Sequence, residues 1–125
     1  MVLLTVPRSI DVAARSVLVN GTTTPDTLRF RVGERYRLRI VDVHVFRPSM
    51  VVRLLRDSTL VAWRAVAKDG MDLPPDRATT RRAIQQMGNG ETYDFEIAPT
   101  EPGDLRLTVS SGVGQLLATM PVQVR

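Results

Sequence analysis

The fold class of this 125-residue chain is decided by residues 16–43, SVLVNGTTTPDTLRFRVGERYRLRIVDV. An alternation of period two, with aromatic and β-branched residues on one face, is typical of half-buried β-strands. Two such runs, separated by Gly33 and Glu34, predict a central hairpin with a tight turn. The alternating residues are Leu28, Phe30 and Val32 with Arg29 and Arg31, then Tyr36, Leu38 and Ile40 with Arg35, Arg37 and Arg39.

The rest of the chain repeats this pattern of short strands and turns. Turn signals such as Asn20-Gly21 and Asp69-Gly70 recur about every 8–12 residues, and no stretch has the periodicity of a long amphipathic helix. These features predict an all-β Greek-key β-sandwich, with residues 1–125 forming a single domain. We expect an edge strand at 1–6, a connection at 7–14, and further strands at 16–20, 50–56, 59–66, 82–87, 91–98, 105–109 and 115–125.

The alternation also predicts which side chains form the core. Asp94 and Glu96 are expected to point outward from their strand. Trp63, the single tryptophan, is expected in the core, because a large aromatic ring is more often buried than used as a stacking platform. The residues expected to point inward are Tyr93, Phe95, Ile97, Leu105, Leu107, Val109, Val122 and Val124.

The composition excludes several classes of site. The chain has no cysteine, which removes disulfides, thiolate nucleophiles and metal sites with a thiolate ligand. The single histidine, His44, has no defined neighbours for a Ser-His-Asp arrangement. Gly88-Asn89-Gly90 is a turn with no helix after it, so it is not a phosphate-binding loop. No complete catalytic constellation is present.

The charge is basic but dispersed. The net charge is +4, and Lys68 is the only lysine among the 17 lysine and arginine residues. The 13 acidic residues are interspersed among the arginines. Nucleic-acid binding is therefore not expected, because it requires a clustered basic stripe.

No targeting or membrane segment is predicted. The first residues, MVLLTVP, lack a basic n-region and a long apolar h-region. No run approaches the roughly 20 apolar residues of a membrane span.

Three segments resemble the cupredoxin-like domains of the multicopper oxidase family, closest to the middle or terminal domains of the bacterial enzymes. VNGTTTPDTLRFRVGERYRLRIVDV is similar to the family pattern "xNG…P…V..G..yRlRi.N". RAVAKDG (64–70) looks like its "a.DG" step, and GETYDFEI (90–97) is similar to "pGeRydv.v". The three segments occur in the family's order over about two thirds of the chain. The resemblance implies a cupredoxin-like fold and, because the family is usually exported, a periplasmic or extracellular parent protein.

The copper ligands of that family are not carried over. Its copper-bearing domains have His-x-His motifs and a His-Cys-His run followed by a methionine, whereas here only His44 follows the RLRI segment. Met120 has no histidine or cysteine nearby and does not match the axial methionine. Met50, Met71 and Met87 are spread along the chain and do not form a copper-binding tract. No metal ligand and no cofactor are predicted.

Three features remain as candidate sites, each with a simpler interpretation. His44 is either a ligand in a metal site shared with another chain or a loop histidine that takes part in no metal site or reaction. We expect the second, because one imidazole cannot fill a four-coordinate site. Asp69, Asp72 and Asp76 lie in KDGMDLPPD, which lacks the glycine and final glutamate spacing of an EF-hand, so we expect a turn and a solvated loop. The third feature is the arginine stripe, Arg29, Arg31, Arg35, Arg37 and Arg39, which either binds an acidic or phosphate-bearing partner or pairs with acids such as Asp94 and Glu96.

The sequence thus predicts a non-catalytic, copper-free cupredoxin-like domain with a structural or interaction role, and not an enzyme. It is either a domain that packs against neighbouring cupredoxin domains or a second copy, or an excised or engineered stand-alone scaffold. The alternative is a basic module that binds polyanions or an acidic protein through the arginine stripe.

Overall fold

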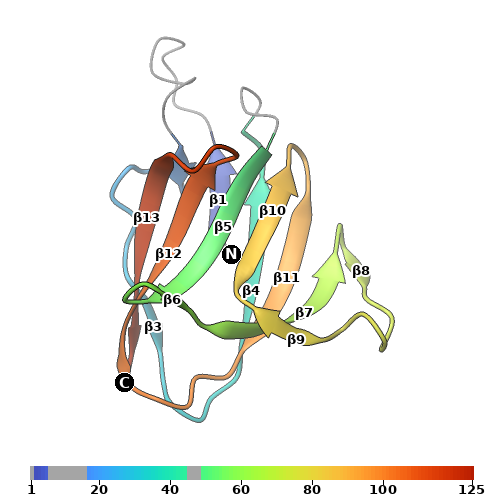
Figure 1. Ribbon diagram of the computed structural model, residues 1–125, viewed down its shortest axis with the longest axis vertical. Coiled ribbons are helices and arrows are strands. Elements are labelled where there is room, and N and C mark those ends of the chain that lie inside the picture. Colours follow the sequence, from blue (N-terminus) through green and yellow to red (C-terminus); the bar gives the residue numbers. More distant parts are fainter. Residues whose placement is uncertain (1, 6–16, 45–48) are drawn as a thin grey trace.

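The computed structural model describes residues 2–5, 17–44 and 49–125, which form two β-sheets packed face to face (Figure 1). The first sheet has the order β2-β1-β4-β11-β7-β8, and β9 also pairs with β7. Its strands are β1 (Val2–Thr5), β2 (Leu18–Val19), β4 (Tyr36–Asp42), β7 (Ala62–Lys68), β8 (Met71–Asp72), β9 (Thr80–Arg82) and β11 (Thr92–Ile97).

The second sheet has the order β10-β5-β12-β13-β3, and the short strand β6 pairs with β5. Two of the strand pairs, β1 with β4 and β3 with β13, are parallel, and the other pairs between described strands are antiparallel. In the described part of the chain, no helical segment has the length and hydropathy needed to cross a bilayer. The strands of the second sheet are β3 (Leu28–Phe30), β5 (Ser49–Arg56), β6 (Thr59–Leu60), β10 (Ile84–Gly88), β12 (Gly103–Ser111) and β13 (Leu116–Val124).

The all-β sandwich is confirmed, but the predicted central hairpin is wrong. β3 pairs with β13 in the second sheet, whereas β4 pairs with β1 and β11 in the first sheet. The chain therefore crosses from one sheet to the other at Gly33, whose φ of 86° is readily adopted only by glycine. Both strands bury one face, so the alternation in the sequence fits a crossover as well as a hairpin.

Two other predicted strands also divide between the sheets. Residues 59–66 switch sheets at Val61, and residues 82–87 switch at Ala83. A ring of three backbone hydrogen bonds holds this corner: Ala83 donates to Val61, Val61 donates to Leu54, and Leu54 donates to Ala83. These main-chain bonds link the two sheets at one edge of the sandwich.

The predicted edge strand at 1–6 is a strand, β1, but it is not at the edge. β1 lies between β4, with which it runs parallel, and the two-residue strand β2. The predicted connection at 7–14 lies outside the described residues.

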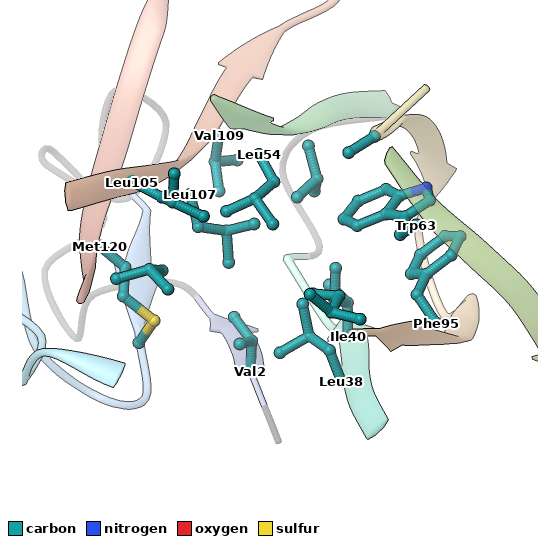
Figure 2. Packing of buried hydrophobic residues seen from close by; sticks show 14 of the residues in the cluster. Val2, Leu38, Ile40, Leu54, Trp63, Phe95, Leu105, Leu107, Val109 and Met120 are labelled. Carbon is teal, nitrogen blue, oxygen red and sulfur yellow. The ribbon is translucent and has the colours of Figure 1, made fainter. Parts of the chain in front are cut away.

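The core fills the space between the two sheets and agrees with the predicted inward residues. Trp63 is 1% exposed and stacks on Phe95, with ring centroids 3.9 Å apart (Figure 2). Leu105, Leu107 and Val109 of β12 lie across the core from Leu38 and Ile40 of β4, and Leu54 lies between them and the ring pair (Figure 2). Met50 and Met87, far apart in sequence, are buried opposite each other on β5 and β10. These contacts tie the two sheets together through apolar burial, the dominant stabilising term.

Candidate functional site

The arginine stripe predicted from the sequence does not lie on one face. Arg29 belongs to β3 in the second sheet and Arg31 follows it, whereas Arg37 and Arg39 belong to β4 in the first sheet. Arg35 immediately precedes β4 and lines a separate depression beside Trp63 and Glu96. The stripe as a single surface is therefore wrong, because its two halves belong to different sheets; partner binding by its members stays a prediction.

In the first sheet the two arginines of β4, Arg37 and Arg39, are neutralised by a carboxylate of β11. Asp94 of β11 accepts hydrogen bonds from Arg37 Nε at 2.8 Å and from Arg39 Nε and Nη2 at 2.9 and 3.0 Å. Asp94 points outward as predicted but is only 2% exposed, because the two arginines cover it. The hydrogen bond from Arg39 lowers the pKa of Asp94, burial opposes this, and the bond from Arg37 adds to the lowering.

Two further ion pairs involve β7 and β11 of the same sheet. Arg64 lies 3.4 Å from Glu96, and Lys68 lies 2.9 Å from Glu91. Together with the Asp94 cluster, these contacts pair the basic side chains of β4 and β7 with acids on β11 and at its start. The expected pairing of the stripe with Asp94 is confirmed for Arg37 and Arg39. Glu96 pairs instead with Arg64, which is not part of the stripe.

In the second sheet three arginines gather around one concavity, which we call the arginine pocket. It has a volume of about 340 Å³ and lies beside the edge strand β3 and the end of β13. Arg29 Nη1 donates to Gln123 Oε1 at 3.2 Å. Among the described residues, none of the three arginines forms an ion pair with a carboxylate. The lining residues are Arg29, Phe30, Arg31, Tyr36, Gln123 and Arg125.

Tyr36 forms the fixed wall of the arginine pocket. Its ring stacks on Phe30 with centroids 4.3 Å apart. Its hydroxyl accepts a hydrogen bond from the backbone N–H of Arg31 at 2.7 Å and donates to Glu34 Oε2 at 2.9 Å. Desolvation, the largest cause, and the nearby Glu34 raise the pKa of Tyr36, so the hydroxyl stays protonated near neutral pH.

His44, expected in a loop, follows β4 but is fully buried. Its backbone N–H donates to Asp42 Oδ1 at 2.9 Å, and Asp42 is also 0% exposed. Burial raises the pKa of Asp42, and the hydrogen bond from His44 partly offsets this effect. Asp42 stands at the asparagine position of the "RlRi.N" pattern, so this buried acid departs from the family resemblance.

The acidic segment begins with a turn, as predicted. Asp69 and Gly70, with φ of 50° and 81°, make the β7–β8 turn, and Asp69 Oδ1 accepts from the backbone N–H of Thr92 at 2.9 Å. The side chain of Asp72 is 91% exposed. Within residues 2–5, 17–44 and 49–125, no three His, Cys, Asp or Glu side chains are grouped so that they could hold a metal ion.

The donor set does not fit the copper centre of a cupredoxin. A type 1 site uses a cysteine thiolate, two imidazoles and a weak axial ligand, usually methionine. The chain has no cysteine and one histidine. Met50, Met87 and Met120 are buried in the apolar core. A methionine could supply only the weak axial ligand, and the thiolate and the second imidazole are missing from the chain.

The arginine pocket includes two residues that the sequence did not single out, Gln123 and Arg125. They lie nearly a hundred positions from Arg29, and only the parallel pairing of β13 with β3 brings them together. The one signal in the sequence was the alternation of Val122 and Val124 with Gln123 and Arg125, which places the polar pair on the outer face.

Comparison with known proteins identifies the fold and not the family. No family model matches the chain, and no curated protein matches it. Solved multicopper oxidases match it along nearly its whole length. The structure of one multicopper oxidase has 13% identity and a TM-score of 0.77 over 99% of this chain and 42% of that chain.

Two further structures agree. The blue copper oxidase from Nitrosomonas europaea has 16% identity and a TM-score of 0.69 over 98% of this chain and 43% of that one. Fet3p, a multicopper oxidase that functions in iron import, has 14% identity and a TM-score of 0.73 over 98% of this chain and 27% of its own. The expected cupredoxin-like fold is thus confirmed, and the chain spans less than half the length of these oxidases.

Proposed function

We propose that this chain, which has the fold of a multicopper oxidase domain, is a copper-free cupredoxin-like domain with a structural or interaction role and no catalytic activity. The observation that carries the proposal is the combination of that fold over 98–99% of the chain with a donor set of one histidine and no cysteine. A domain without these ligands provides packing surface to its neighbours instead of an electron-transfer site.

The expected partner is a neighbouring cupredoxin-like domain of a longer parent protein. In support, the chain spans 42% of one matched oxidase and 27% of another. The turn between β12 and β13 offers an apolar contact, because Val113 is 95% exposed and Leu116 is 58% exposed. Exposed apolar side chains grouped at one turn are typical of surfaces that another protein covers.

Copper loading tests the proposal directly. The purified chain is incubated with Cu(I) and with Cu(II), dialysed, and analysed for metal content and visible absorption. We expect less than stoichiometric copper and no intense blue band. One tightly bound copper per chain with such a band would refute the copper-free assignment.

A stand-alone scaffold, excised or engineered, is the other form of this proposal. Size-exclusion chromatography and a thermal melt distinguish the two forms. A cooperative monomer favours a self-sufficient scaffold. Aggregation or self-association that Val113→Asp with Leu116→Asp abolishes favours a domain that normally has a neighbour on this turn.

A second candidate function, anion binding, is favoured by one observation. Arg29, Arg31 and Arg125 surround one concavity and have no carboxylate partner among the described residues, whereas the arginines of β4 do. Retention on heparin that falls with salt, and that the substitutions Arg29→Glu and Arg31→Glu remove, would support it. No retention at low salt would exclude it.

A further inference from the structure

The register of β3 and β13 places like charges side by side. Arg29 is paired with Gln123, and Phe30 with Val124. The next step of the ladder sets Arg125 beside Arg31, since Arg125 N–H donates to Phe30 O and Val32 N–H donates to Arg125 O at 2.7 Å. Like charges directly opposite each other on neighbouring strands are destabilising unless an opposite charge lies between them.

The outer face of the first sheet shows how this chain otherwise treats such a pair. Arg37 and Arg39 are neighbours on one strand, β4, and a buried carboxylate, Asp94, accepts hydrogen bonds from both. No described acid takes that place between Arg31 and Arg125. The missing counter-charge is the first of two observations that indicate a ligand.

The second observation is the size of the arginine pocket and the contacts that hold its lining side chains in place. Its volume of about 340 Å³ lies at the lower end of the range of small-molecule sites, roughly 300–1,000 Å³. Gln123 holds the guanidinium of Arg29, and the stacked rings of Phe30 and Tyr36 form an apolar wall. Glu34, which accepts a hydrogen bond from the Tyr36 hydroxyl, lies beside this wall.

We propose that the arginine pocket binds a small oxyanion with two or more negative charges, that is, a phosphate-bearing or polycarboxylate molecule. Guanidinium groups donate paired N–H bonds to phosphate groups and to carboxylates. The geometry of the pocket therefore defines the class of multivalent oxyanions and does not distinguish its two members. Arg31 and Arg125 hold the anion between them, and Arg29 of β3, two residues before Arg31, adds a third donor group. The inference rests on the second candidate function and is independent of the structural role.

Isothermal titration calorimetry with inorganic pyrophosphate, and in a separate arm with citrate, tests the proposal. We expect saturable binding of one anion per chain at low salt, weakened in 0.15 M salt but still measurable. Tighter binding of pyrophosphate assigns the site to phosphate-bearing ligands, and tighter binding of citrate assigns it to polycarboxylates. Ligand binding should also raise the melting temperature with concentration, since only the folded chain forms the pocket.

Two double variants of equal charge provide the comparison. Arg29→Gln with Arg125→Gln removes two pocket arginines and should weaken binding at least tenfold. Arg77→Gln with Arg82→Gln removes the same charge from exposed positions outside the pocket and should leave the affinity within twofold. All four side chains are exposed, so both variants should fold. A neutral Gly-Ser extension after Arg125 excludes an effect of a terminal carboxylate.

A readout without ligand separates the pocket from general charge effects. Because Arg31 and Arg125 are neighbours across the strand pair, Arg125→Gln alone should raise the melting temperature at low salt, and the rise should vanish in 0.5 M salt.

The inference is overturned if neither anion binds saturably, or if both double variants lose affinity equally. If heparin is retained while pyrophosphate and citrate fail, anion binding stands and the small-ligand assignment is wrong.

Discussion

The clearest test of the structure is the substitution Asp94→Asn. Asp94 is 2% exposed and accepts three hydrogen bonds from two guanidinium groups across β4 and β11. Asparagine keeps the shape and one acceptor oxygen but removes the negative charge. Arg37 and Arg39 then lie next to each other without a counter-charge.

The expected loss is about 2 kcal/mol. Hydrogen bonds to a charged group contribute about 1.5–3 kcal/mol. We take the lower part of that range because the side chains of Arg37 and Arg39 are 50% and 51% exposed, so water screens them. With an unfolding entropy of about 2.1 cal/mol/K per residue, 2 kcal/mol corresponds to a fall in melting temperature of about 8 °C for this chain.

The pH dependence identifies the charge as the cause. The pKa of Asp94 is lowered in the folded state, so its stabilising effect is present above the unfolded pKa of about 3.9 and is lost as the pH falls through the folded pKa. The difference between the wild type and Asp94→Asn should therefore be constant from pH 5 to 8 and shrink below pH 4. Thermal unfolding followed by circular dichroism measures both.

Glu96→Gln is the matched control on the same strand. Glu96 forms one contact of 3.4 Å with Arg64 and its side chain is 25% exposed, so its loss should cost about 1 kcal/mol or less. A melting temperature of Asp94→Asn within 1 °C of the wild type, or equal to that of Glu96→Gln, would refute the reasoning.

Two further substitutions test the buried residues. Asp42→Asn should stabilise the protein by about 1 kcal/mol at pH 7, since a buried amide costs less than a buried carboxylate. Burial raises the pKa of Asp42, so the folded state favours the protonated carboxyl group. The wild-type protein therefore has its full stability below the unfolded pKa of Asp42 and loses stability as the pH rises through the folded pKa. The variant's advantage should therefore disappear near pH 4, and a variant less stable than the wild type at pH 7 contradicts this. Trp63→Ala should cost about 3–5 kcal/mol in urea unfolding because it empties the ring stack with Phe95, whereas Trp63→Phe should cost less. A loss below 1 kcal/mol for Trp63→Ala would place the ring outside the core.

Some features of the candidate sites could be predicted from the sequence, and others depend on contacts between residues far apart in the chain. The lack of a copper ligand set followed from the residues alone, because no fold can supply a thiolate that the chain does not contain. The pairing of Asp94 with arginines was also predictable from the outward charges on two alternating segments, although 55 residues separate Asp94 from Arg39. The arginine pocket was not, because Arg125 joins Arg29 and Arg31 only through a parallel strand pair.

The sequence by itself determined the approximate position of most strands, the inward residues and the all-β fold class, because the period-two alternation reports which face of each strand is buried. Only the tertiary structure decided which strands pair. The predicted hairpin is divided between the two sheets, and the segments around Val61 and Ala83 change sheets at one corner. Alternation is satisfied by any partner that leaves the apolar face inside. The choice of partner depends on backbone hydrogen bonds and core contacts between residues far apart in the chain.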